Sequence, residues 1–121
     1  MVVDEALSRA EADRVFHALA DATRRDIVTR TMGEPLSVSA LARAYPMSFA
    51  AVQKHVAVLE GAGLVTKRRR GREQLVQGNP RTVHRATFLL DQLDALWRAR
   101  ADRMTEILAE GRDRPHQGAP T

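Results

Sequence analysis

The spacing of hydrophobic residues changes twice along this chain, and that limits the folds available to it. Before residue 64, apolar residues recur at helical intervals of three and four. The segments 64–69 and 73–77 are typical of strands and flank the turn sequence Arg70-Gly71-Arg72. Helical spacing returns after Pro80, a residue suited to the first turn of a helix. The pattern predicts a mainly helical chain interrupted by one β-hairpin.

Capping residues divide the part before the hairpin into four helices. Ser8 and Glu11 have the Ser-x-x-Glu spacing of a capping box. Asp21, Ser37 and Ser48 are suited to cap the next three helices. Breaking residues follow each of these at Gly33 with Pro35, at Pro46, and at Gly61 with Gly63. With the helix after Pro80, the prediction is about five helices and a two-stranded hairpin.

The length and composition indicate a single domain. The chain has 121 residues, 44% of them hydrophobic, which is enough for one core. We assign that domain to residues 1–110. Residues 111–121 contain two prolines and two glycines without periodic apolar residues, so we expect a flexible C-terminal tail.

The charge and the absent residue types exclude several classes of function. There are 19 basic and 15 acidic residues, and five of the basic ones lie within 67–72. The absence of cysteine excludes disulfides, thiolate metal sites and cysteine nucleophiles. No apolar run reaches the length of a membrane span, and the first residues lack the layout of a signal peptide. We therefore expect a soluble, cytoplasmic protein without membrane contact.

The helix predicted to follow Ser48 has an unusual outward face. At 100° per residue, its core-facing side holds Val52, His55, Val56 and Leu59. The opposite side holds Ala50, Gln53, Lys54 and Ala57. Small residues allow close approach to another surface. Glutamine can pair with adenine, and lysine with guanine or phosphate. The preceding short helix and turn make this the second helix of a helix-turn-helix, with the basic hairpin as a wing.

Other functions fit the sequence less well. One alternative is a helical hairpin packed on a β-ribbon, with a solvated basic turn. Another is a winged helix that docks on another protein without binding DNA. Neither a nucleophile elbow nor a phosphate loop is present, which argues against an enzyme. One tyrosine and three phenylalanines provide no stacking platform for RNA.

Four stretches resemble the winged helix-turn-helix of the ArsR/SmtB repressors: "LADATRRDIV" (19–28), "LSVSALA" (36–42), "AVQKHVAVLEGAGLV" (51–65) and "KRRRGREQLVQ" (67–77). These motifs separate that family less sharply from its MarR-type relatives. The resemblance implies a transcriptional regulator, a homodimer that represses by binding a palindromic operator in double-stranded DNA. It implies DNA contacts from the recognition helix and wing, here Ser48, Phe49, Gln53, Lys54, Arg68, Arg70 and Arg72.

The chain departs from the family's metal sensors. Where many members carry cysteines it has Ser37-Val38-Ser39, and its C-terminal helix lacks a histidine beside its acidic residues. The four histidines show no short ligand spacing, and His55 is interpreted as a structural residue or a phosphate donor. We expect no metal site and no cofactor, and the sequence identifies no inducer.

The C-terminal helix has an apolar stripe wide enough for a second surface. Its members are Leu90, Leu93, Trp97, Ala101, Met104 and Leu108, broadened by Leu89, Leu96 and Ile107. One interpretation is that the stripe covers a small monomeric core. We favour a homodimer in which this helix pairs across a two-fold axis together with Val15, Phe16 and Leu19 of the first helix.

Overall fold

The computed structural model describes residues 6–118, with side chains described as far as Arg112. It divides into two compact units, one up to Thr87 and one from Phe88 onward. No helix in the described part of the chain is both long and apolar enough to cross a membrane.

The first unit contains four helices and the start of a fifth. They are α1 (Arg9–Leu19), α2 (Ala22–Gly33), α3 (Val38–Arg43), α4 (Phe49–Gly61) and the first residues of α5 (Pro80–Gly118). Each predicted cap is present. The Ser8 and Glu11 side chains satisfy each other's backbone N–H groups at 3.1 and 2.8 Å. Asp21, Ser37 and Ser48 each accept a bond from the backbone N–H three residues on. Local capping therefore sets the start of all four helices.

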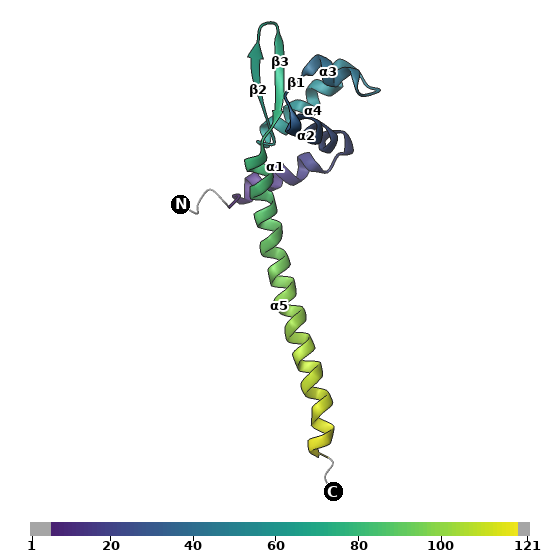
Figure 1. Ribbon diagram of the computed structural model, residues 1–121, viewed down its shortest axis with the longest axis vertical. Coiled ribbons are helices and arrows are strands. Elements are labelled where there is room, and N and C mark those ends of the chain that lie inside the picture. The colour runs from purple at the N-terminus through teal and green to yellow at the C-terminus, as the bar shows by residue number, and fades with distance from the viewer. Residues whose placement is uncertain (1–5, 119–121) are drawn as a thin grey trace. The chain divides into compact units, whose positions relative to one another are not determined.

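The hairpin is part of a three-stranded antiparallel sheet in the order β1-β3-β2. The strands are β1 (Leu36–Ser37), β2 (Val65–Arg70) and β3 (Glu73–Gly78), and Gly71 takes a positive φ of 64° in the turn. The predicted hairpin is confirmed (Figure 1). The third strand was not predicted, because two residues carry no periodic signal. Leu36 pairs with Val76, which attaches the hairpin to the segment before α3.

The core of the first unit lies between the helices and the inner side of the sheet. Its fully buried side chains are mainly aliphatic and come from α1, α2, α3, α4, the bend before β2 and the strands: Val15, Ile27, Leu41, Val52, Val56, Leu59, Leu64, Val65 and Val76. Asn79 closes the junction after the hairpin. Its Nδ2 donates to the carbonyl of Gly63 at 3.0 Å and to Oγ1 of Thr82 at 3.2 Å. The end of α4 is thereby held to the start of α5.

The second unit is the remainder of α5. The sequence predicts that this helix ends near Glu110, whereas the structure continues it to Gly118. Once a helix is formed, each added residue gains a hydrogen bond, so a single glycine at position 111 need not end it. The flexible tail at 111–121 stays a prediction, and 119–121 lie outside the described residues. Phe88 and Leu89 at its start are partly buried. Seven large apolar side chains farther along are more than half exposed: Leu90, Leu93, Leu96, Trp97, Met104, Ile107 and Leu108.

Candidate nucleic-acid interface

The outward face of α4 is small and polar, with one aromatic residue. Gln53 and Lys54 are exposed, and the exposed Ala50 and Ala57 flank them. Phe49, the first residue of the helix, is 47% exposed. The opposite face is buried in the core, as predicted. The helix is therefore anchored on one side and free to approach another surface closely on the other.

The N-terminus of α4 is formed by Ser48. Its Oγ accepts a hydrogen bond from the backbone N–H of Ala51 at 3.1 Å, and its carbonyl accepts one from Val52 at 3.1 Å. The Ser48 hydroxyl hydrogen is not used by this cap. The helix dipole also places partial positive charge at this end. A phosphate group near this terminus would therefore meet favourable charge and a hydroxyl donor.

Arg24 ties α4 to the two helices before it. Its guanidinium, at the start of α2, donates to the carbonyls of Ala18 and His17 at 2.7 and 3.2 Å and to Nδ1 of His55 at 3.1 Å. The Oδ2 atom of Asp21 lies 3.9 Å from the same Nδ1. The hydrogen bond from the backbone N–H of Arg24 is the main cause that lowers the pKa of Asp21 below its usual value. His55 is thus a partnered structural residue at one edge of α4.

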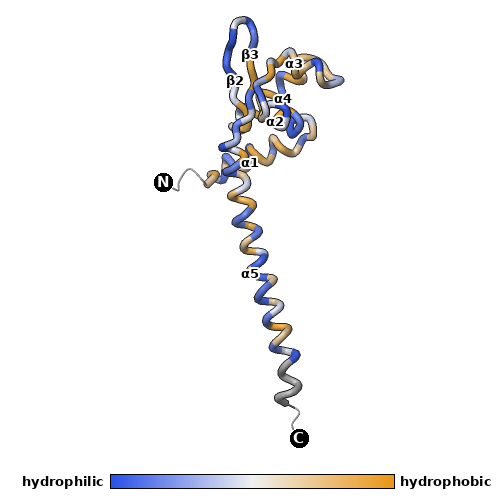
Figure 2. Tube along the Cα trace, in the orientation of Figure 1, coloured by the Kyte–Doolittle hydropathy of each residue, from blue (hydrophilic) through white to orange (hydrophobic). Residues whose placement is uncertain are grey.

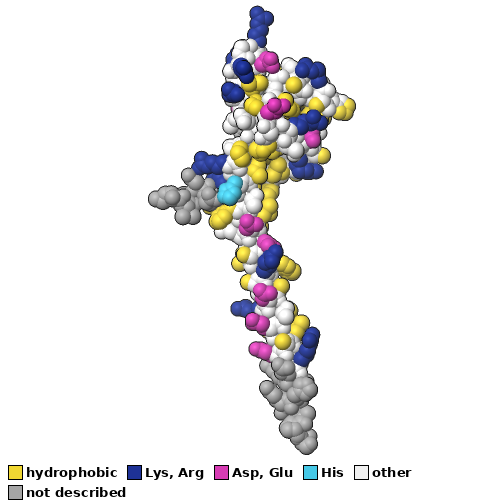
Figure 3. Space-filling view, viewed as in Figure 1, with side chains coloured by type: hydrophobic (Ala, Val, Ile, Leu, Met, Phe, Trp, Pro, Cys, Tyr) yellow, Lys and Arg dark blue, Asp and Glu magenta, His cyan; other side chains and the backbone are white. Residues whose placement is uncertain are grey.

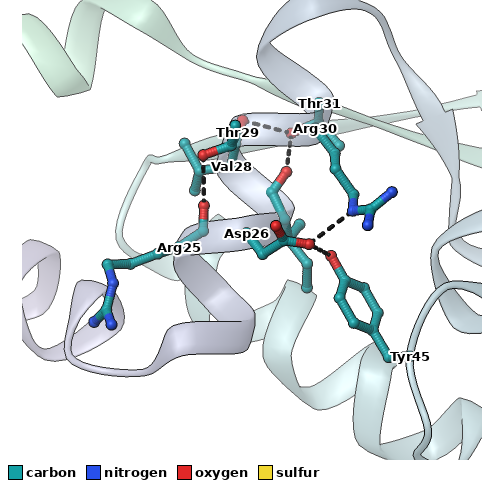
Figure 4. Close-up of polar contacts among 8 residues, drawn as sticks. Arg25, Asp26, Val28, Thr29, Arg30, Thr31 and Tyr45 are labelled. Atoms are coloured by element: carbon teal, nitrogen blue, oxygen red, sulfur yellow. Dashed lines mark hydrogen bonds and ion pairs between the residues drawn. The ribbon is translucent and has the colours of Figure 1, made fainter.

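A second cluster joins α2 to the turn before α4 (Figure 4). The Tyr45 hydroxyl donates to Oδ2 of Asp26 at 2.6 Å, and Nε of Arg30 donates to the same oxygen at 2.7 Å. The Arg30 guanidinium also lies over the Tyr45 ring, 5.6 Å from its centroid. The tyrosine bond and then the arginine bond lower the pKa of Asp26. Burial, followed by the bond to Asp26, raises the pKa of Tyr45 to about 12.

The wing presents its basic residues to solvent. Arg68, Arg70 and Arg72 are exposed on β2 and the turn. This part of the hairpin is strongly hydrophilic (Figure 2), and Lys and Arg side chains gather there (Figure 3). Lys67 is partly covered and lies 3.4 Å from Oε1 of Glu60 near the end of α4. One ion pair therefore connects the wing to the helix, while the arginines farther along the hairpin are accessible to phosphate.

Comparison with known proteins assigns this arrangement to a family. Residues 19–68 match a helix-turn-helix domain model. The HTH-type transcriptional regulator Rv2034 of Mycobacterium tuberculosis is 42% identical over 85 residues, which cover 70% of this chain and 77% of that protein. An ArsR-like transcriptional regulator from Rhodococcus sp. RHA1 is 33% identical, with a TM-score of 0.73 over 81% of this chain and 92% of that one. The chain belongs to the ArsR family of winged helix-turn-helix transcriptional regulators.

A second neighbour, described as a possible ArsR-family transcriptional regulator, has a solution structure. The homodimeric winged helix-turn-helix DNA-binding domain of Mb0332 from Mycobacterium bovis is 28% identical, with a TM-score of 0.59 over 71% of this chain and 79% of that one. These relationships identify a DNA-binding regulator and not an enzyme. Among the described residues, no group of three or more histidine, cysteine, aspartate or glutamate side chains could hold a metal ion.

The structure separates the predicted site residues of this ArsR-family chain into two sets. All seven predicted DNA contacts are exposed: Ser48, Phe49, Gln53, Lys54, Arg68, Arg70 and Arg72. In the predicted dimer set, Phe16 and the α5 residues from Leu90 to Leu108 are exposed, and Leu19 is partly buried. Val15 is fully buried in the core of its own unit, so assigning it to a dimer surface is wrong. Its spacing places it beside Phe16 but does not reveal which helix covers it.

Sequence reasoning missed the residues that hold α4 in place. Arg24 and Tyr45 occur in ordinary polar patterns, and their partners are 31 and 19 residues away along the chain. Nothing local marks Arg24 as the partner of His55.

Proposed function

We propose that this ArsR-family regulator is a homodimeric repressor that binds a palindromic operator through α4, the recognition helix, and the wing of β2 and β3. The observation that supports this most is the outward face of α4. Gln53 and Lys54 project from it between small alanines, so the helix backbone can come close to a base-pair edge. A solvated helix has no need of such a close approach.

We assign base recognition to the polar pair and backbone contact to the wing. Glutamine can bond two edge atoms of adenine, and lysine can bond O6 and N7 of guanine. Arg68, Arg70 and Arg72 of the wing are exposed and have long side chains that can reach the backbone of the duplex. Phosphate contacts orient the protein on the duplex without reading its sequence.

The dimer is proposed from the unpartnered apolar stripe on α5. Leu90, Leu93, Trp97, Met104 and Ile107 follow steps of three, four, seven and three, a heptad spacing typical of paired helices. All five are more than half exposed in the protomer. The homodimeric Mb0332 domain supports the same assembly for this chain. Two copies would present two recognition helices to the two halves of a palindrome.

The test is binding to the DNA upstream of the protein's own gene, compared with a random duplex of equal length. Gln53→Ala should weaken operator binding by about 1–3 kcal/mol per half-site while random-duplex binding changes little. Equal losses on both duplexes would show that Gln53 does not read bases. A protein that shifts neither duplex at moderate salt would instead support a docking function.

A further inference from the structure

Phe49 is an outlier on the recognition helix. The structure describes every residue of α4, and its other large apolar side chains face inward: Val52, Val56 and Leu59 are at most 1% exposed, and Val58 is partly buried. Phe49 alone among them leaves nearly half of its surface in water. At 100° per residue Phe49 lies about 40° from Gln53 and about 20° from Val56, at the edge of the outward face, where its exposed ring can contact an apolar group outside the protomer.

Phe49 is held in the first turn of α4. It follows the Ser48 cap directly and lies within the first turn, closed by the bond from Val52 N–H to the Ser48 carbonyl. Phe49 and Gln53 are four residues apart, so their side chains lie on one row of the helix surface. Residues at the N-terminus of a recognition helix are those that contact base edges. Phe49 therefore lies beside the residue to which we assign adenine.

The chemistry of the major groove restricts what this ring can contact. The edges of guanine, adenine and cytosine carry hydrogen-bond donors and acceptors, whereas thymine adds an apolar C5-methyl group. A phenyl ring cannot replace the water bonds of a polar edge atom, so covering such an atom is unfavourable. Contact with a methyl group removes apolar surface of both the ring and the methyl from water, which is favourable.

We propose that Phe49 is a specificity-determining residue that contacts the C5-methyl group of a thymine in each half-site. This inference rests on the proposed function, in which α4 enters the major groove. Four residues of helix rise by about 6 Å, and base pairs are about 3.4 Å apart. The thymine is therefore one or two base pairs from the base that Gln53 reads.

Deoxyuridine provides the test because it pairs as thymidine does and lacks only the methyl group. The operator is first obtained by selection from a pool of random duplexes with the purified full-length protein. Each thymine of the half-site is then replaced by deoxyuridine, symmetrically in both halves. Removing a buried methyl lowers affinity about fourfold, so one symmetric pair of replacements should lower it about 15-fold.

The variants connect that effect to Phe49. Phe49→Ala should weaken operator binding and lose the response to deoxyuridine at that position, whereas Phe49→Leu should keep part of it. Gln53→Ala is the matched control on the same row of the helix, and it should keep the full deoxyuridine response. Unchanged thermal unfolding of each variant confirms that the exposed substitutions leave the fold intact.

The results of these binding measurements distinguish the methyl contact from the proposed function on which it rests. A selected operator without any deoxyuridine-sensitive position, or a Phe49→Ala variant that keeps the sensitivity, would overturn the methyl contact while leaving the regulator assignment standing. Equal weakening of operator and random duplex by Phe49→Ala would assign the ring to the sugar–phosphate backbone and also overturn it. Failure to select any duplex would overturn the proposed function and this inference together.

Discussion

Nη1 of Arg24 donates a hydrogen bond of 3.1 Å to Nδ1 of His55, joining the start of α2 to the middle of the recognition helix. Arginine has only donors, so Nδ1 of His55 must be the acceptor and carries no proton in this arrangement. The same guanidinium bonds the last carbonyls of α1. One side chain thus connects three helices and orients the one that we propose reads DNA.

Arg24→Lys should destabilise the fold and weaken operator binding. A lysine ammonium cannot reach the carbonyls of α1 and Nδ1 of His55 together, so part of this partly buried network is left unsatisfied. We expect the free energy of unfolding to fall by about 1–3 kcal/mol, measured by urea titration. Arg25→Lys is the control, since Arg25 bonds the carbonyl of Leu19 from an exposed position. The free energy of unfolding of Arg25→Lys should stay within about 0.5 kcal/mol of the wild-type value.

A conservative replacement of His55 distinguishes orientation from simple packing. In His55→Asn the side-chain oxygen can take the place of Nδ1 and accept from Arg24, whereas His55→Leu removes the acceptor. We expect operator affinity to be kept better in the asparagine variant than in the leucine variant. If the leucine variant binds the operator as well as the wild type does, the hydrogen bond does not orient α4.

The Tyr45 hydroxyl should ionise at a higher pH than an ordinary tyrosine, and the stability of the fold should fall at alkaline pH. Its pKa is raised to about 12 in the folded protein, whereas an unperturbed tyrosine titrates near 10. The folded state therefore holds the proton more tightly, and the associated stability is full below about pH 10 and is lost as the pH rises towards about 12. Tyr45 is the sole tyrosine. The ultraviolet absorbance of tyrosinate therefore measures the ionisation of Tyr45 directly. A titration midpoint near pH 10 in the folded protein would contradict the raised pKa.

Tyr45→Phe should separate the contribution of the hydroxyl from that of the ring. Loss of the 2.6 Å bond to Asp26 should cost about 1–2 kcal/mol at neutral pH. The fall of the free energy of unfolding at alkaline pH should also become smaller, because no phenol remains to ionise. Asp26 should show a higher pKa, since the tyrosine bond is the main cause of its lowered value. Urea titrations at several pH values measure the stability changes.

Removing the wing arginines should weaken binding to every duplex. Each phosphate contact contributes about 0.9 to the slope of log affinity against log salt concentration. Arg70→Ala with Arg72→Ala removes up to four contacts from a dimer, so the slope should flatten by up to about 3.6. The matched control replaces Arg98 and Arg103, two exposed arginines of α5. An unchanged slope in the wing variant would exclude phosphate contact by these residues.

Trp97→Ala should shift the protein towards monomer. The ring is 67% exposed in the protomer and lies within the apolar stripe of α5, where a partner helix would cover it. Truncating an anchor of this kind costs about 2–4 kcal/mol of association. Sedimentation over a range of concentrations measures the change, with the adjacent Arg98→Ala as control. A wild-type protein that is monomeric at micromolar concentration would contradict the dimer.

The sequence by itself determined the elements whose signals are local. Ser8, Asp21, Ser37 and Ser48 predict where four helices begin, because a cap acts on a backbone N–H three residues away. The turn at Gly71 and the basic segment around it predict the wing. The outward face of α4 follows from helix geometry alone, and its exposure is confirmed.

The tertiary structure alone decided which distant groups meet. The pairing of Leu36 with Val76, the bond from Arg24 to His55 and the bond from Tyr45 to Asp26 each join separate elements. The burial of Val15 beside an exposed Phe16 also depends on which helices pack over α1. Such contacts leave no periodic trace in the chain, because they depend on the packing of elements against one another and not on the spacing of residues within one element.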